Sequence, residues 1–469
     1  MIAFVEKYHK LSIVLVLISA FVYYYIGYPL VRTDVTILIS LYGIAFLSFF
    51  GLIRLEKSNV VFLTGIAIVL RLVFMGNIPN LSQDFYRFIW DGRMLIAGWN
   101  PYLYLPNDLM ASGTAPIAEA QELFNGMGDL SASHYTNYPP INQLCFAIAG
   151  FISGKSIIGS VFVLRIIIIL ADIGTLYFGK KLLERLGIPI KNIWLYILNP
   201  FIIIELTGNL HFEGVMIFFL VWSLYLLHKS SWKWAAVLLA LSVSVKLIPL
   251  IFLPILFQWF TKYKASEISK NTFPTIWKGI LKLIAFYGIV IGTIALLFIP
   301  FISKQFIENY QATVGLWFQN FEFNASIYYI ARWIGYKIVG WNMIKDIGRV
   351  TPIIVLVFIT GISLFRNNKD FQKTITALLF GLSFYFFTTT TMHPWYLATL
   401  LILSVFTNYR FTIVWSFMMI FSYTAYRNEG YAENLGFVAF EYIIVYSFLL
   451  WELFFKKRKE ANASSHLLI

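Results

Sequence analysis

Two carboxylates and two arginines lie close together directly after an apolar stretch of the chain. The segment reads Ser82-Gln-Asp-Phe-Tyr-Arg-Phe-Ile-Trp-Asp-Gly-Arg93, and it opens the longest polar stretch of the sequence. Charged groups at a membrane are costly and are usually retained for a function. A carboxylate among aromatic side chains is partly desolvated, which raises its basicity. The pattern therefore predicts an active site with a carboxylate general base, working on a charged, lipid-linked substrate.

The spacing of the charges in this segment allows two interpretations. If Ser82 caps a helix, Asp84 lies in the first turn, and Asp84, Arg87 and Asp91 share one helical face. The first interpretation is a surface helix in which Asp84 balances the dipole and pairs with Arg87 at i,i+3. The second is a functional helix at the membrane interface. The many surrounding aromatic residues favour the second interpretation.

The composition predicts an all-α, polytopic transmembrane helix bundle. Of 469 residues, 59% are hydrophobic and only 13% are charged, and apolar stretches long enough to cross a bilayer recur along the chain. The net charge of +13 is distributed in short loops, where it sets orientation, so we expect membrane lipids and no nucleic acid as partners. The single cysteine, Cys145, excludes a disulfide framework and a cysteine-based metal site.

We expect about 12–14 spans, and basic clusters between them all fall on one side. That side is cytoplasmic by the positive-inside rule, which places both termini inside. Residues 1–460 form one membrane domain, and residues 461–469 form a disordered tail. The first large external loop, 77–156, is long enough to fold on the membrane surface, with an interfacial helix after Tyr138-Pro-Pro140. The expected spans are roughly 11–30, 34–53, 59–76, 157–178, 192–207, 214–228, 233–247, 249–260, 280–300, 350–366, 373–391, 394–408, 411–427 and 437–455.

Further polar side chains occupy the predicted outer loops and outer helix ends. A lipid monophosphate leaving group needs cationic stabilisation, and arginine or lysine can supply it directly, so no divalent metal and no cofactor is expected. The absence of a phosphate-binding glycine-rich turn argues against a nucleotide-sugar donor. The candidate substrate- or phosphate-binding residues are Arg87, Arg93, His211, Glu213, Lys246, Glu322, Asn324, His393 and Tyr396.

Each of these candidates also has a purely structural interpretation. His211 and Glu213 can cap a polar turn between two spans, and His393 can be a structural histidine. Lys246 can extend from a helix end toward water. Glu322 and Asn324 suit sugar recognition beside neighbouring aromatic residues, and an ordinary interfacial loop explains them equally well.

Three charged residues lie inside expected spans. Arg165 and Asp172 are seven residues apart on one helical face, and Arg71 lies in another span. We expect interhelical ion pairs rather than catalysis from them.

The ordered set of motifs resembles the GT-C fold glycosyltransferases, and most closely the bacterial alpha-mannosyltransferases that use polyprenyl-phosphate-mannose. The resemblance spans about residues 60–400. Its motifs are Asp84-x-Tyr86-Arg87-x-x-Trp90-Asp91-Gly92, Gly98-x-Asn100-Pro101-Tyr102, Tyr138-Pro-Pro140, Gly208-Asn-x-His211-x-Glu213-Gly214, Lys246-x-x-Pro249, Asn320-Phe-Glu-Phe-Asn324 and His393-Pro-Trp395-Tyr396.

The resemblance implies an inverting hexosyltransferase with an acidic general base in the first external loop. We carry the role of base onto Asp84, with Asp91 as the alternative. The implied partners are a polyprenyl-phosphate-linked sugar, most closely mannose, and a glycan or lipid-linked acceptor at the outer face of the bacterial cytoplasmic membrane. In many relatives this loop follows the first helix, whereas here it follows the third expected span, which indicates an additional N-terminal hairpin.

Two other functions remain open from the sequence. A lipid-linked oligosaccharide flippase or another polytopic transporter can have about as many helices, but such proteins tend to show internal repeats and short loops. This chain instead concentrates polar groups on one side. A polymer ligase that uses a diphosphate lipid is a further alternative, because basic residues alone do not separate a monophosphate from a diphosphate.

Overall fold

The structure is a computed structural model, and it describes residues 2–262, 273–427 and 432–456; the predicted disordered tail, 461–469, lies outside these residues. Most of the described residues are helical, and none of them belongs to a β-strand. The α-helices are α1 (Ile2–Gly27), α2 (Val35–Glu56), α3 (Val60–Leu72), α4 (Asp84–Ile96), α5 (Pro106–Ala111), α6 (Ala120–Ala132), α7 (Pro140–Ser153), α8 (Ile157–Arg185), α9 (Trp194–Ile197), α10 (Pro200–Ile202), α11 (Glu213–His228), α12 (Trp232–Val243), α13 (Phe257–Lys262), α14 (Phe273–Phe298), α15 (Lys304–Gln319), α16 (Ile327–Val339), α17 (Ile344–Phe365), α18 (Phe371–Thr388), α19 (Leu397–Val405), α20 (Phe411–Met418) and α21 (Leu435–Trp451).

Short 3-10 and π-helical segments connect several of these helices. They are η1 (Pro101–Leu103), η2 (Ile190–Ile193), η3 (Ile203–Gly208), η4 (Ile248–Phe252), η5 (Pro254–Leu256), η7 (Ile299–Phe301), η8 (Pro394–Tyr396), η9 (Met419–Arg427) and η10 (Glu452–Lys456). Proline occupies the first or second position of η1, η4, η5, η7 and η8, where its missing N–H costs no hydrogen bond.

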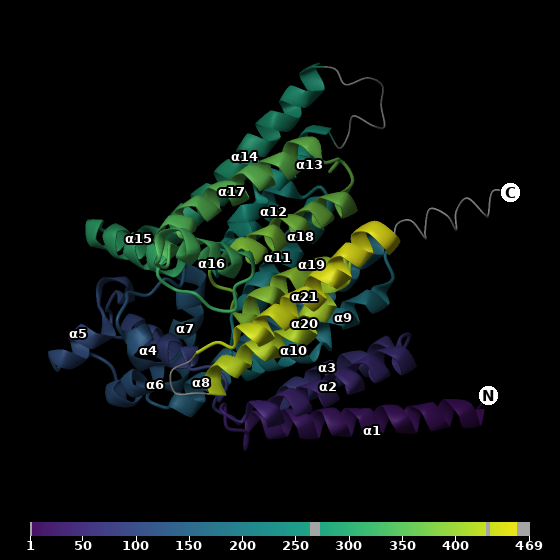
Figure 1. The fold of residues 1–469 in the computed structure, drawn as a ribbon, viewed down its shortest axis with the longest axis horizontal. Coiled ribbons are helices and arrows are strands. Elements are labelled where there is room, and N and C mark those ends of the chain that lie inside the picture. Colours follow the sequence, from purple (N-terminus) through teal and green to yellow (C-terminus); the bar gives the residue numbers. More distant parts are fainter. Residues whose placement is uncertain (1, 263–272, 428–431, 457–469) are drawn as a thin grey trace.

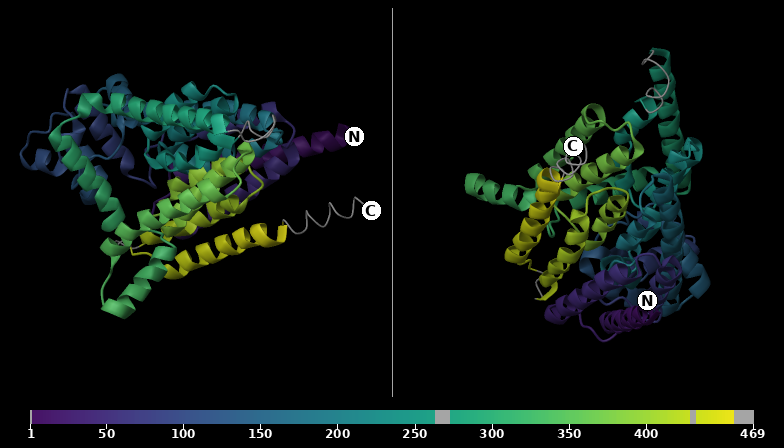
Figure 2. Two further views of the ribbon diagram at one scale, coloured as in Figure 1. Left: turned by 90° about the horizontal axis from the view of Figure 1, so that it is seen from above. Right: turned by 90° about the vertical axis from the view of Figure 1, so that its right-hand side faces the viewer.

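The helices form a bundle with two distinct ends (Figure 1). The start of α1 and the end of α21 lie at one end, and α4, α5 and α6 lie at the other, as Figure 2 also shows. Helix α11 packs against α8 and α12, and α19 packs against α18 and α20. All nine side chains of α19 are buried, so this helix lies in the core.

The predicted helical membrane bundle is confirmed, but the expected number of full-length spans is not reached in the described part of the chain. By length and composition, six helices there can cross a membrane, or seven if the bent pair 190–197 and 200–208 counts as one span. Proline explains that break, because Pro200 starts α10 after an Asn199 cap. Six further apolar helices have 10–17 residues; at 1.5 Å per residue they reach about 15–25 Å, short of a roughly 30 Å hydrocarbon core.

The loop 77–156, which the sequence predicted to be external, folds into helices α4 to α7, and the predicted helix after Tyr138-Pro-Pro140 is present as α7. Helix α4 packs closely on α7 at Gly92. A Cβ atom at this glycine would lie 2.2 Å from the Phe146 carbonyl oxygen. Only glycine therefore allows the two backbones to approach this closely.

We expect Gly92→Ala to destabilise the protein by about 1–3 kcal/mol, because the new methyl group meets backbone that cannot move aside without separating α4 from α7. The measurement is the thermal unfolding midpoint in detergent. Gly65→Ala in α3 is the matched control, since nothing lies within 4 Å of a Cβ atom there. An equal midpoint for the two variants would contradict the close packing.

The charged residues inside the bundle are paired or hydrogen-bonded. Arg71 of α3 and Asp172 of α8 form the expected interhelical ion pair, with an Nε–Oδ2 distance of 2.7 Å. Arg165 instead donates to backbone carbonyl oxygens, including those of Asn77, Thr207 and Gly208. Arg165 thereby links the segment that follows α3 to the end of η3.

Candidate active site

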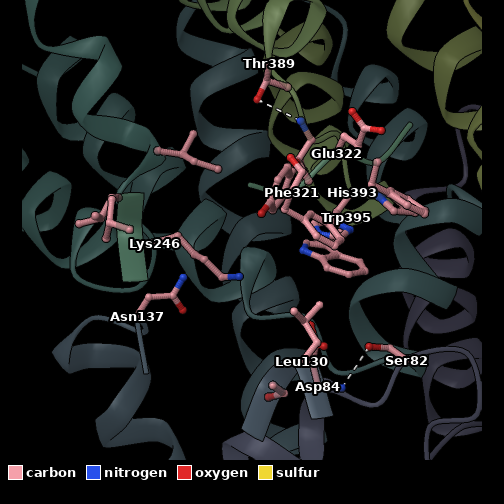
Figure 3. Close-up of a pocket in the computed structure, with 18 of the residues that line it drawn as sticks. Ser82, Asp84, Leu130, Asn137, Lys246, Phe321, Glu322, Thr389, His393 and Trp395 are labelled. Carbon is pink, nitrogen blue, oxygen red and sulfur yellow. Dashed lines mark hydrogen bonds between the residues drawn. The ribbon is translucent and has the colours of Figure 1, made fainter. Parts of the chain in front are cut away.

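Segments far apart in the sequence line one large cavity of about 1320 Å³ (Figure 3). They come from the start of α4, the stretch after α6, the start of η4 and η5, the segment before α16, the turn before η8, and the residues that follow α20. Two of these segments are hydrogen-bonded to each other, because Phe323 donates to the Thr390 oxygen and Met392 donates to the Phe323 oxygen. The cavity therefore joins the loops in which the sequence placed its candidate chemistry.

Asp84 is the first residue of α4 and lines the cavity. Its backbone N–H donates to Ser82 Oγ over 3.4 Å, so Ser82 contacts the helix start as expected, although Gln83 occupies the cap position. The Asp84 side chain is 35% exposed, and one carboxylate oxygen lies 3.8 Å from His211 Nε2. A partly exposed carboxylate at a cavity wall has the access that a general base needs.

Asp91 lies outside the cavity lining and is fully buried. Arg87 Nε binds one Asp91 oxygen at 2.8 Å, and Gln143 donates to the other at 3.0 Å. The ion pair of this helix is therefore i,i+4, Arg87 with Asp91, rather than the i,i+3 pair with Asp84. Arg93 also lies outside the lining and donates to the backbone oxygens of Ala118 and Lys155, so it connects distant parts of the loop 77–156.

Lys246 lines the cavity, and its amine lies 3.0 Å from the Glu213 carboxylate. Glu213 is fully buried at the start of α11, whereas Lys246 retains some exposure. Figure 3 shows the Lys246 amine extending into the space that Asp84, His393 and Trp395 also face. Glu213 does not line the cavity itself. It influences the cavity by balancing the charge of Lys246 and by holding the Lys246 amine in place.

His211 and His393 both stack on the indole of Trp395. The ring centroid of Trp395 lies 3.7 Å from that of His211 and 4.6 Å from that of His393. His393, Trp395 and Tyr396 line the cavity, whereas His211 is only 1% exposed and lies behind Asp84. Direct substrate contact is therefore open to His393 but not to His211 in this arrangement.

Two histidines of the cavity wall are held neutral. Burial lowers the pKa of His393 to about 3, with a contribution from the charges of His211 and Lys246. Burial and the nearby Arg87 lower the pKa of His134 to about 4. At neutral pH these imidazoles can exchange hydrogen bonds with a substrate, but they add no positive charge.

Glu322 lines the cavity and is held by Arg332, by the Tyr328 hydroxyl and by Asn342. Asn324 does not line the cavity, and its backbone N–H and side chain bind Glu433 and Glu441, so it supports the fold. Trp317 and Phe318 are the neighbouring aromatic residues in the sequence, and the structure describes their backbone but not their side chains.

Arg32 is a cavity residue that the sequence did not single out. It lies in the turn between α1 and α2, and its guanidinium carbon is 3.3 Å from the centre of the Tyr426 ring. The other cationic side chains of the described lining have carboxylate partners: Arg87 with Asp91, Lys246 with Glu213, and Arg332 with Glu322. Among the ion pairs of the described residues, Arg32 has no such partner, so it is the lining cation that no carboxylate contacts directly.

Within the described ranges, no group of three or more histidine, cysteine, aspartate or glutamate residues is placed to hold a metal ion. Cys145 is buried.

Comparison with known proteins agrees with the features of this site. The cavity and the bundle define a membrane-embedded, all-helical protein with carboxylate, cationic and aromatic groups in one chamber. Residues 30–262 match the family model described as alpha-(1->6)-mannopyranosyltransferase, N-terminal domain. The chain is also 23% identical, over 358 residues, to alpha-(1->6)-mannopyranosyltransferase A of Corynebacterium glutamicum; the match covers 71% of this chain and 68% of the relative.

The helical membrane fold and these matches support a GT-C-type mannosyltransferase, and therefore a membrane hexosyltransferase. The resemblance inferred from the motifs is confirmed at this level. The matches indicate alpha-mannosyltransferase activity and do not favour the transporter alternative.

Proposed function

We propose that the protein transfers mannose from a polyprenyl phosphate to a glycan or lipid-linked acceptor, with inversion at the anomeric carbon. Asp84 accepts the proton of the acceptor hydroxyl, whose oxygen attacks that carbon while the bond to the phosphate oxygen breaks. The reaction occurs at the outer face of a bacterial cytoplasmic membrane, with both termini cytoplasmic. The names of the matching family and of the Corynebacterium glutamicum relative suggest an alpha-(1->6) linkage in the product.

The main observation in favour of a lipid-linked donor is that the cavity that contains Asp84 also has an apolar wall. Side chains of η4 and η5 face side chains of α17 across this part of the cavity. Two of them, Leu250 and Leu356, are 38% and 59% exposed. Accessible apolar side chains beside charged groups in one cavity suit a prenyl chain whose phosphate must reach those charged groups.

The phosphate needs positive charge when it leaves as a lipid monophosphate. Arg32 and Lys246 are the proposed ligands, because both line the cavity beside neutral His134 and His393. Arg32 contributes the larger share, since Glu213 already balances Lys246. This arrangement provides phosphate binding through protein side chains and is the reason that we expect no requirement for a divalent metal.

The test compares donors with purified protein in detergent. Radiolabelled polyprenyl-phosphate-mannose, GDP-mannose and a polyprenyl-diphosphate sugar are each supplied with an acceptor extract, with and without EDTA. The proposal expects a glycosidic product from the monophosphate lipid, at the same rate in EDTA. Transfer from GDP-mannose or from the diphosphate lipid instead, or a product that disappears in EDTA, would overturn it.

We expect Arg32→Gln to raise the KM for the polyprenyl-phosphate donor by about 10- to 100-fold, because a charge-assisted hydrogen bond to the phosphate contributes about 1.5–3 kcal/mol. Initial rates at varied donor concentration give the measurement. Arg54→Gln is the matched control, since Arg54 is exposed near the end of α2 and does not line the cavity. Equal donor KM values for the two variants would remove Arg32 from the phosphate site.

A further inference from the structure

Behind Asp84, His211 lies between two carboxylates in a buried layer of the site. One His211 nitrogen, Nδ1, lies 2.9 Å from the backbone oxygen of Glu205 and 3.6 Å from its carboxylate. The other, Nε2, lies 3.8 Å from Asp84 Oδ2. Glu205 is 3% exposed and accepts hydrogen bonds from the Tyr423 hydroxyl at 2.7 Å and from Asn209 at 3.3 Å.

The hydrogen bond of Nδ1 places one proton of His211, whereas Nε2 has no hydrogen-bond partner among the described residues and has Asp84 as a neighbouring carboxylate. A carbonyl oxygen is only an acceptor, so Nδ1 carries a proton and donates it to the Glu205 backbone. If the ring were neutral, Nε2 would present a lone pair to the ionised carboxylate of Asp84, and two acceptors would face each other. A proton on Nε2 removes this conflict. The resulting imidazolium is compensated by two carboxylates and stacked on the Trp395 ring.

The backbone also holds His211 in this position at some conformational cost. The preceding residue, Leu210, has a φ of 62°, a region that a leucine rarely adopts. Arg165 donates to the carbonyl oxygens of Thr207 and Gly208 at the start of the same turn. Strained backbone that is braced by a buried arginine is typical of a side chain whose placement matters for function.

We propose that His211 is a positioning residue for the Asp84 base, held as a doubly protonated imidazolium by Glu205. This inference rests on the proposed function of Asp84. The His211 Nε2–H is directed at Asp84 Oδ2, which leaves the other carboxylate oxygen to accept the proton of the acceptor hydroxyl. His211 keeps its own proton throughout the transfer. The 3.8 Å separation is an ion-pair distance, and such contacts shorten when substrate fills a site.

The charged and titratable groups that determine whether His211 is protonated come from several elements packed around its imidazole ring. Asp84 belongs to α4, Glu205 to η3 and Tyr423 to η9. The turn before η8 contributes His393, whose pKa is lowered to about 3 so that it stays neutral, and Lys246 follows α12. Arg32, in the turn between α1 and α2, belongs to the same cluster, because its charge acts on Tyr426 together with the charges of Asp84 and Glu205. The two carboxylates favour the charged ring, and the Lys246 and Arg32 cations oppose it.

Kinetics of three variants test the positioning role. Glu205→Gln removes one carboxylate at constant shape, so the fall of kcat at high pH is expected to begin about one pH unit lower than in the unmodified protein. His211→Gln supplies a fixed amide N–H toward Asp84 and is expected to keep part of kcat without a high-pH fall. His211→Ala is expected to lower kcat at least 10-fold with an unchanged donor KM. Reduced rates with superimposable pH profiles in all three variants would indicate a structural role and overturn the proposal.

A spectroscopic measurement separates this inference from the proposed function. The chain has six histidines, so ¹⁵N-histidine NMR spectra of the full-length protein and of His211→Gln assign the His211 signal by its loss. Nitrogen shifts of an imidazolium at neutral pH, with neutral-ring shifts for His393, are expected whatever donor the enzyme uses. A neutral His211 would overturn the inference alone, whereas failure to use polyprenyl-phosphate-mannose would overturn only the proposed function.

Discussion

Replacing Asp84 with asparagine is expected to lower kcat for sugar transfer by about 10²–10⁴-fold, the contribution typical of a general base. The amide has the same shape as the carboxylate but cannot accept the proton of the acceptor hydroxyl. Because the side chain is 35% exposed, the substitution should leave the thermal unfolding midpoint and donor binding unchanged. Single-turnover transfer from a labelled donor, together with a donor-binding assay, measures both effects.

Two other aspartates of the same loop serve as controls for Asp84→Asn. Asp108→Asn changes an exposed residue of α5 that does not line the cavity, so neither activity nor stability should change. Asp91→Asn removes the buried partner of Arg87 and should destabilise the protein. If Asp84→Asn transferred sugar at the unmodified rate, the base would have to be another group.

Replacing Lys246 with methionine is expected to cost roughly 3–5 kcal/mol of stability, because it leaves the fully buried Glu213 carboxylate without its cation. The partial exposure of Lys246 places the expected value near the lower limit. The same change removes a proposed phosphate ligand, so transfer should fall as well. Thermal unfolding in detergent and initial transfer rates give the two readouts.

The double variant Lys246→Met/Glu213→Gln separates stability from activity. Neutralising both partners removes the buried charge, so the unfolding midpoint should return most of the way toward that of the unmodified protein. Transfer should stay low, because the cavity still lacks the cation. Recovery of both properties in the double variant would show that Lys246 acts only through the fold.

The sequence predicted the helical bundle and the convergence of its polar loops well, because both depend on patterns that a chain displays directly. Apolar stretches and the side on which basic residues fall are visible in any single sequence. The segments with Asp84, Lys246, Glu322 and His393 were placed on one side, and in the structure they line one cavity. The number of spans was harder to predict, because short and broken helices such as 190–208 have the same apolar composition as full spans.

The spacing of the charged residues in the sequence could not predict which of them are buried or which partners they bind. Asp84 and Asp91 were equivalent as acidic residues of one helical face, and only the approach of Gln143 from α7 shows that Asp91 is enclosed. His211 was expected at the substrate and lies behind Asp84 instead. Arg32 gave one usable signal, an arginine in a short turn on the predicted outer side, where the candidate phosphate-binding residues also lie.

The most direct test of the account is the anomeric configuration of the product formed from a β-linked polyprenyl-phosphate-mannose. Attack by an acceptor oxygen that Asp84 deprotonates is one displacement, and one displacement inverts the anomeric carbon. The account predicts an α-mannoside by NMR of the purified product. A β-mannoside would contradict it, because retention requires a second displacement and a nucleophile that the proposed mechanism does not contain.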